Sequence, residues 1–170
     1  MDDALYKYGV INKKQVSVSV ENWMDIWSWR EYKTKPSDWF KLKPTIHTNQ
    51  DGYKNYVIKF NNKNYGLSRV IYKLYNKDWH ITDNGSDNQI DHININSLDN
   101  RIENLRVLTN QQNQYNRKNI RGYYFDKKRG KYRAQLKSNK KCYFGKLRDT
   151  PEEARADYLL LKAEHHVLPE

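Results

Sequence analysis

Short stretches of alternating hydrophobic and polar residues run through the first eighty positions and predict β-strands. They cover residues 15–20, 56–60 and 64–75. The Asn-rich residues 61–64 indicate a hairpin connection, and 49–52 indicate another turn. The end of the last stretch, 69–75, places Val70, Ile71 and Leu74 at helical spacing, so a short helix is expected there.

Four tryptophans crowd the same region, at Trp23, Trp27, Trp29 and Trp39. We expect them in the core, because each indole buries a large apolar area. Stacking on nucleic-acid bases is the alternative that the sequence leaves open.

A second pattern follows a polar, turn-rich linker at 81–88 and fills residues 89–120. Asp91 and His92 come directly after an apolar residue, as at the end of a short strand. An Asx-rich loop, 94–100, is followed by a second alternating stretch at 104–108. Thr109 is then placed to cap a helix that presents Asn113 and Asn116 on its first turns.

The last fifty residues predict three strands and one helix. The strands are expected at 121–126, 131–137 and 141–147, and the helix from residue 151. Thr150 as N-cap, Pro151 at the first helical position and Glu153 in a capping box mark the helix start. Alternation in the middle strand turns Ala134 and Leu136 toward the helix, with Tyr132 on the same side.

Composition limits the class of protein. The 170 residues suit one or two small domains, and a single Cys excludes an internal disulfide framework or a Cys-built zinc site. No apolar run is long enough to span a bilayer, and the acidic start lacks the apolar region of a secretory signal. We therefore expect an intracellular protein, in the cytoplasm of the host cell or in the nucleus of a eukaryotic host.

The net charge of +11 is concentrated in one segment. Residues 118–148 contain twelve Lys and Arg and one acid, Asp126, whereas the rest of the chain is balanced. A basic segment interleaved with Tyr and Phe is typical of a polyanion-binding surface, and nucleic acid is the expected partner. A solvated Lys-rich face is the alternative. An anionic membrane is disfavoured, because the segment predicts strands instead of a basic amphipathic helix.

Residues 90–117 hold side chains suited to phosphodiester hydrolysis. The carboxylate of Asp91 and the amides of the following helix offer oxygen donors that suit Mg²⁺ or Mn²⁺. A neutral imidazole such as that of His92 is the natural base for a water near pH 7. Metal, base and phosphate together define a phosphodiester hydrolase.

This segment resembles the HNH (His-Me finger, ββα-metal) endonucleases, in the variant where the last His is Asn. The resemblance rests on the ordered set Asp-His, Asp-Asn-Arg, Asn-Leu-Arg, Thr and Asn-x-x-Asn-Arg over about 28 residues. It implies Asp91 and Asn113 as ligands of one divalent cation, His92 as general base and Asn104 as the residue that orients the imidazole. Asn116 and Arg117 occupy a secondary position near the metal or the scissile phosphate.

Other roles stay open for several of these residues. Asn104 would otherwise only cap a turn, and Arg117 would be one more phosphate-neutralising cation. Asp99, Asn100 and Arg101 are expected to build the loop, with Asp99 capping the turn and Arg101 pairing with it. Upstream, residues 42–44, 52–60 and 63–75 resemble the lead-in of phage-type HNH proteins, with Leu67-Ser68-Arg69 where that family often has His-Arg-Leu.

The C-terminal region resembles the ethylene-response-factor (APETALA) type of DNA-binding domain. The matching residues are 121–123, 130–132, 134–137, 143–145 and the helix opening at 150–158. Side chains on the outer face of such a sheet read the major groove. The contacts expected here are Arg121, Arg133, Gln135, Lys137, Lys141 and Tyr143.

The sequence thus predicts an α+β protein of two domains. Residues 1–120 form the nuclease domain, with a small β-rich lead-in at 1–80 and the ββα-metal motif at 89–120. Residues 121–170 form a three-stranded antiparallel sheet packed on one helix. The expected function is metal-dependent cleavage of duplex DNA by a phage or mobile-element, homing-type nuclease, with no membrane association and no obligate protein partner evident. A DNA-binding protein without catalysis is the alternative, and an RNA-directed nuclease is disfavoured.

Overall fold

The computed structural model describes residues 2, 4–83, 85–116 and 120–168 of the chain. The protein is a mixed α+β structure of small antiparallel sheets and few helices, as the sequence predicts. Its contacts divide it into two compact units, Met1–Asn110 and Gln111–Glu170. The domain boundary expected after residue 120 stays a prediction.

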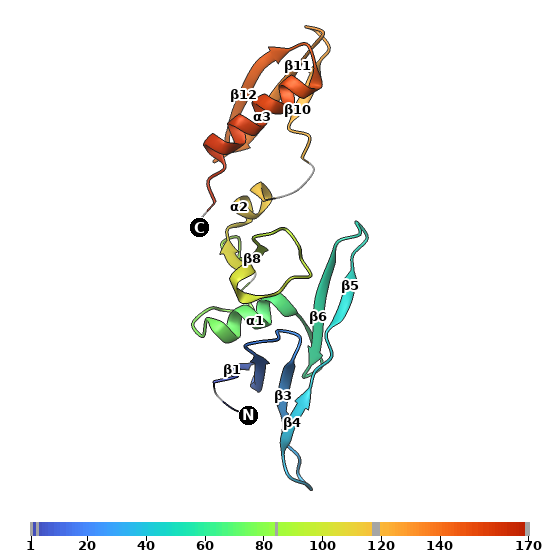
Figure 1. The fold of residues 1–170 in the computed structure, drawn as a ribbon, viewed down its shortest axis with the longest axis vertical. Coiled ribbons are helices and arrows are strands. Elements are labelled where there is room, and N and C mark those ends of the chain that lie inside the picture. The colour runs from blue at the N-terminus through green and yellow to red at the C-terminus, as the bar shows by residue number, and fades with distance from the viewer. Residues whose placement is uncertain (1, 3, 84, 117–119, 169–170) are drawn as a thin grey trace. The chain divides into compact units, whose positions relative to one another are not determined.

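Two sheets and one helix form most of the first unit (Figure 1). Neighbouring strands pair antiparallel in chain order in both sheets. The first sheet contains β1 (Tyr6–Ile11), β2 (Lys14–Ser19), β3 (Ile26–Arg30) and β4 (Asp38–Lys41), and the second contains β5 (Thr45–Thr48), β6 (Lys54–Phe60) and β7 (Lys63–Gly66).

Two-residue turns that begin with Asn connect β1 to β2 and β6 to β7. Asn12 and Lys13 both have positive φ, and so do Asn61 and Asn62. Two consecutive left-handed residues define the turn whose twist matches that of antiparallel strands, and Asn tolerates this conformation better than most residues. The hairpin predicted at 61–64 is confirmed.

Helix α1 (Leu67–Tyr75) packs against both sheets of the first unit. Its buried side chains are Leu67, Val70, Ile71 and Leu74, the predicted face with one residue added. They join Val16, Val18, Ile26 and Ile58 in the main core. The expectation that the four tryptophans form this core is wrong in part: Trp23 packs against it, but all four are only half-buried.

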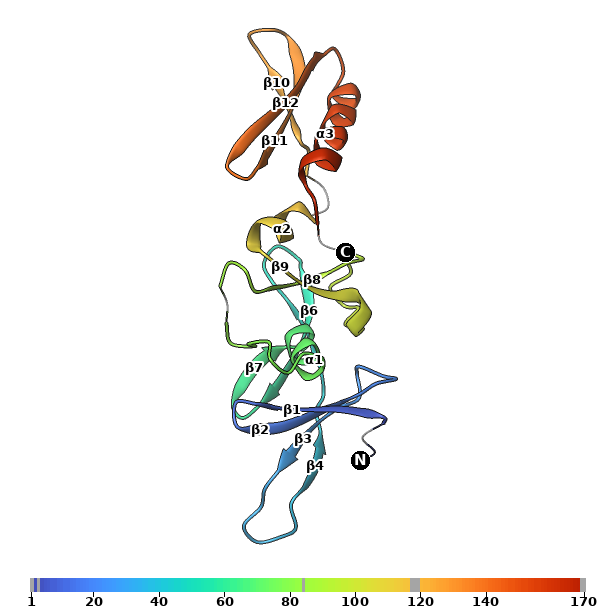
Figure 2. The same ribbon diagram turned by 90° about the vertical axis from the view of Figure 1, so that its left-hand side faces the viewer.

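The second unit has its own small core beneath a three-stranded sheet, β10 (Tyr123–Asp126), β11 (Lys131–Ser138) and β12 (Lys141–Arg148). Helix α3 (Pro151–His165) lies along one face of this sheet (Figure 2). Ala134, Leu136 and Tyr158 are buried between them, with Leu161 against them. Thr150 and Glu153 form the predicted capping box.

No helix in the described part of the chain combines the length and apolar character needed to cross a membrane.

Candidate active site

A two-stranded sheet places Asp91 and His92 side by side. Strand β8 (Gln89–His92) pairs antiparallel with β9 (Leu105–Leu108), so that Asp91 lies opposite Arg106 and His92 opposite Leu105. Both Asp91 and His92 are buried. They end a short strand, as the sequence predicts.

The imidazole of His92 is held by the side chain of Asn100. His92 Nε2 lies 3.1 Å from Asn100 Oδ1, and Asn100 is only 1% exposed. When Nε2 carries the proton, it donates to this oxygen and the lone pair lies on Nδ1. That neutral tautomer is the form a general base requires.

Asn104 was expected to orient the imidazole of His92, but its side chain bonds within the loop instead. Its amide nitrogen donates to Asn94 Oδ1 at 3.0 Å and to the carbonyl oxygen of Asp99 at 2.7 Å, while its Oδ1 accepts from the backbone of Asn94. Both amide protons are thereby used inside the loop. Asn104 shapes the loop, and Asn100, which the sequence suggested was loop structure only, contacts the imidazole.

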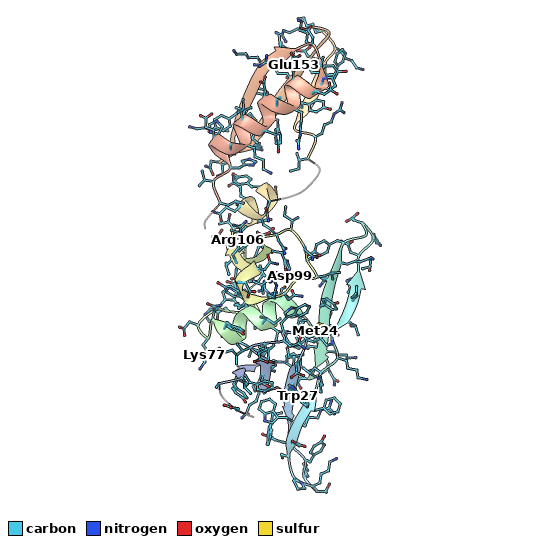
Figure 3. All side chains as sticks on the ribbon, viewed as in Figure 1. Met24, Trp27, Lys77, Asp99, Arg106 and Glu153 are labelled. Carbon is cyan, nitrogen blue, oxygen red and sulfur yellow. The ribbon has the colours of Figure 1, made fainter. Side chains whose placement is uncertain are left out.

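The Asx-rich loop is closed by the predicted pair of Asp99 and Arg101. Arg101 Nε and Nη2 donate to the two carboxylate oxygens of Asp99 at 2.9 and 2.8 Å. The backbone N–H of Arg101 also donates to Asp99 Oδ1, at 3.4 Å. The hydrogen bonds from Arg101 lower the pKa of Asp99 to about 2. This carboxylate is therefore ionised throughout the physiological range, and its bonds to Arg101 hold the loop together. Asp99 is labelled in Figure 3.

Asp91 forms an ion pair with Arg106 across the two strands. Arg106 Nε donates to Asp91 Oδ2 at 3.0 Å, and the two side chains are 15% and 8% exposed. A buried carboxylate needs such compensation, because an isolated charge is costly away from water. Sequence reasoning missed Arg106, although strand pairing around Asp91 could have revealed it.

Arg69 of α1 fastens the segment before β8, which the sequence suggested was only a linker. Its guanidinium donates to the carbonyl oxygens of Ile81, Asp83 and Asn88 at 2.7–3.1 Å. The buried side chain of Asn88 donates to the carbonyl oxygens of His80 and Asp83 in the same segment. Ser68, next to Arg69, is half-buried. The lead-in to Asp91 and His92 is thus fixed to the main core.

Helix α2 (Asn110–Tyr115) starts directly after Thr109, as predicted. Asn113 lies on it and is half-buried, whereas Asn116 follows its last residue. Within the second unit, Tyr115 at the helix end bonds Ser138 through its hydroxyl at 2.8 Å and stacks on His166. Arg117 lies outside the described residues.

The donors that the sequence suggests for a metal are one carboxylate and one amide. Among the residues described, no three His, Cys, Asp or Glu side chains gather into a metal-binding cluster. Asp91 and Asn113 nevertheless offer oxygen donors, which is the chemistry that a hard cation such as Mg²⁺ prefers. The donor types therefore fit a divalent cation.

The basic sheet presents three of the six expected DNA contacts on its outer face. Gln135 and Lys137 are exposed, and Arg133 is half-buried, with Nε donating to the carbonyl oxygen of Gly145. Tyr143 is paired with buried Leu136 and stacks on His165 of α3 at 3.7 Å. Its ring faces the helix and not the groove-reading side, so the expected contact is corrected.

The two remaining positions lie at the ends of this sheet. Arg121 is exposed, and its guanidinium lies over the Tyr123 ring. Lys141 is exposed at the start of β12, where it pairs with buried Ser138 and therefore lies on the helix side of the sheet, as Tyr143 does. Asp126 pairs with Arg129 at 2.7 Å and closes the β10–β11 turn, which gives this acid in a basic segment a structural role.

Comparison with known proteins gives one match. No curated protein and no solved structure matched the chain. Residues 80–115 match the family model described as HNH endonuclease. The matched segment contains β8, the Asx-rich loop, β9 and α2, and with them Asp91, His92, Asn100, Asn104 and Asn113. The match supports a nuclease of the HNH type.

Proposed function

We propose that the protein is a metal-dependent endonuclease that hydrolyses phosphodiester bonds in duplex DNA. The carrying observation is the buried pair Asp91 and His92 at the end of β8, with the imidazole held by Asn100, inside the segment that matches the HNH family. A solvated loop would not bury these two titratable side chains together.

His92 is the general base in this proposal. Its Nε2 is occupied by Asn100, so Nδ1 takes the proton from a water that attacks the phosphorus in line. Asn100 keeps the ring in one orientation and one tautomer, and Asn104 keeps the loop that carries Asn100 in shape. Neither amide changes its charge during the reaction.

Asp91 and Asn113 would hold one divalent cation, Mg²⁺ or Mn²⁺. When bound, the cation supplies positive charge to the phosphate and to the departing 3′ oxygen. Arg106 would keep the Asp91 carboxylate oriented through Oδ2. Asn116 and Arg117 would take a secondary position near the metal or the scissile phosphate.

The C-terminal sheet would bind duplex DNA as an APETALA-type reader. Gln135 and Arg133 suit the edges of adenine and guanine, whereas the lysines neutralise phosphates. The proposed contacts are Arg121, Arg133, Gln135, Lys137 and Lys141. A nuclease with such a module fits a phage or mobile-element, homing-type enzyme with some site preference.

Plasmid cleavage tests the proposal. The purified protein is incubated with supercoiled plasmid and Mg²⁺, with EDTA, and as the His92→Ala variant. Loss of a general base is expected to lower the rate by about 10²–10⁴-fold. His47→Ala is the matched control, because His47 is exposed on β5 and lies outside the matched segment.

The control should cleave like the wild-type protein. Equal cleavage by the wild-type protein with Mg²⁺, with EDTA and with His92→Ala would refute the nuclease assignment. Binding of DNA without any metal-dependent cleavage would instead establish the non-catalytic alternative.

A further inference from the structure

One face of the β1–β4 sheet is covered by aromatic rings. Paired residues share a face of a sheet, and Tyr8 pairs with Ser17, Ser17 with Trp27, and Trp29 with Trp39. The face opposite the core, here called the aromatic face, therefore carries Tyr6, Tyr8, Trp27, Trp29 and Trp39. All five side chains are half-buried.

The rings on the aromatic face meet at an angle instead of stacking. Tyr8 and Trp39 have centroids 5.7 Å apart and planes inclined at 57°, and Trp29 meets Trp39 at 5.6 Å and 69°. In such a tilted pair the edge of one ring packs against the π face of the other, so the ring that contributes its edge keeps its own π faces clear of that neighbour. The aromatic face therefore offers ring surface to a planar ligand. These rings lie on the side of the sheet opposite the core, so filling the core does not explain them.

A pocket of about 460 Å³ opens beside these rings. Its walls include Tyr8, Gln15 and Trp39 from the sheet, together with Lys73 and Lys77 from the end of α1 and the segment after it. Both charged side chains in this lining are basic, and Lys73 donates a hydrogen bond to the carbonyl oxygen of Lys77. The site combines flat apolar walls, one amide and two positive charges.

We propose that this pocket binds an unpaired nucleotide of DNA. The base stacks against Trp39 and Tyr8. The Gln15 amide, which has both donors and an acceptor, can form hydrogen bonds with the edge of the base. The two lysines receive the adjoining phosphates, and this charge complementarity favours a nucleotide over a neutral sugar, which aromatic walls also accept. Paired bases hide their faces in the duplex, so the site prefers a single strand.

The proposal adds a second kind of nucleic-acid contact to the chain. The basic segment 118–148 would bind phosphates of a duplex, with strong salt dependence. Stacking on the aromatic face depends less on charge, and every base has a face to stack. The pocket would therefore retain an unpaired strand under conditions that weaken phosphate contacts.

Binding of short oligonucleotides to the full chain, in EDTA, tests the proposal. Fluorescence anisotropy is recorded with oligothymidine of about 15 nucleotides and with a duplex of equal length. Trp39→Ala is expected to weaken oligothymidine binding about fivefold or more and leave duplex binding within about twofold. Trp39→Phe, which keeps an aromatic ring, should retain most of the affinity.

Phe40→Ala is the matched control. Phe40 is the next residue on β4, is 45% exposed and lies on the opposite face of the sheet, beneath the Arg30 guanidinium. Its loss should leave both affinities unchanged. An equal effect of Trp39→Ala and Phe40→Ala, or an equal loss for single strand and duplex, would overturn the site. Tighter binding of oligouridine RNA than of oligothymidine would overturn the assignment to DNA.

Two further measurements guard against misfolding of Trp39→Ala. The double variant Lys73→Gln/Lys77→Gln removes charge without touching the ring contacts and should also weaken oligothymidine more than duplex. Photocrosslinking of iododeoxyuridine oligonucleotides should label peptides of β1 or β4, and labelling confined to residues 121–148 would refute the proposal. Because no cleavage is measured, failure here leaves the proposed nuclease activity standing.

Discussion

The buried carboxylate of Asp91 is held in an ion pair with Arg106. Arg106 lies on the facing strand and donates through Nε, and both side chains are largely withdrawn from water. Removing one member of a buried ion pair leaves the other charge uncompensated. A divalent cation at Asp91 would provide a second source of positive charge.

Arg106→Gln is therefore expected to destabilise the first unit by roughly 3 kcal/mol in EDTA. Mg²⁺ should restore part of this loss and stabilise the variant more than the wild-type protein, because the ion replaces the missing charge. All five tryptophans lie between residues 23 and 79, so tryptophan fluorescence during urea unfolding follows this unit.

Arg101→Gln provides the comparison for Arg106→Gln. Arg101 also pairs with an acid, Asp99, but it lies in the Asx-rich loop and its side chain is 56% exposed. Its removal should cost about 1 kcal/mol or less and should not create a response to Mg²⁺. If Mg²⁺ has the same effect on both variants, Asp91 does not bind the cation.

Protonation of Asp99 makes the stability of the fold depend on pH. Its pKa is lowered to about 2, first by the hydrogen bonds from Arg101, from an ordinary value of 3.8. A carboxyl group with a lowered folded-state pKa stabilises the fold above its unfolded-state pKa, and this contribution disappears as the pH falls from about 4 to 2. Stability should thus decline over this range.

Asp99→Asn is expected to lower stability at neutral pH and to flatten the acid dependence between about pH 4 and 2. Urea unfolding at several pH values, followed by tryptophan fluorescence, measures both effects. Asp2→Asn is a suitable control, since Asp2 is exposed near the chain start. An acid dependence that is the same in Asp99→Asn and in the wild-type protein would contradict the role given to Asp99.

At the scale of elements, the features that depend only on residues close together in the sequence were predicted correctly. The hairpin at 61–64, the buried face of α1 and the capping box of α3 follow from neighbouring residues, and the structure confirms them. The position of Asp91 and His92 at a strand end was predicted for the same reason.

The errors arose where contacts depend on the path of a loop or on the pairing of strands. Asn100 and Asn104 are both buried amides near His92 in sequence, and only the loop geometry decides which one contacts the imidazole. Likewise, Tyr143 was assigned to the wrong face because its side is set by pairing with Leu136. The exposure of the tryptophans follows from which face α1 covers.

Two glycines of the second unit have similar backbones and different surroundings. Gly122 has φ +74°, and a Cβ there would lie 2.2 Å from the Tyr158 ring, whereas Gly130 has φ +62° and open space. Gly130→Ala should cost about 1 kcal/mol from backbone strain alone. Gly122→Ala adds a clash with a buried side chain of α3 and should cost about 3 kcal/mol or more.

Hydrogen exchange of the β11 amides measures these losses, because the second unit contains no tryptophan. Tryptophan fluorescence should report little change in the first unit for either variant. Equal destabilisation by Gly122→Ala and Gly130→Ala would mean that the α3 contact does not determine the glycine at 122.

At the scale of the whole molecule, the residues proposed for catalysis and the excess positive charge lie in different segments of the chain. The segment that matches the HNH family occupies residues 80–115, whereas the entire excess of positive charge lies in residues 118–148. Each unit has its own core. Affinity for DNA and cleavage of DNA should therefore respond to different substitutions.

The basic hairpin at the end of β11 offers the sharpest test of this separation. Lys137, Lys140 and Lys141 are exposed around the Asn139–Lys140 turn. Each lysine that neutralises a phosphate adds about 0.9 to the slope of log affinity against log salt concentration, so replacing all three by Gln should reduce the slope by about 2 to 3. Cleavage at low salt should persist, because Asp91 and His92 are unchanged.

The matched variant replaces Lys54, Lys59 and Lys63 by Gln, which removes the same charge from exposed positions of the β5–β7 sheet. Its slope should change by less than that of the hairpin variant, since the first unit contains 16 Lys and Arg against 13 Asp and Glu, a net charge of only +3. Duplex binding by anisotropy at several salt concentrations gives both slopes. Identical slopes would mean that net charge alone attracts the DNA, and the C-terminal sheet would then lose its assignment as the duplex-binding surface.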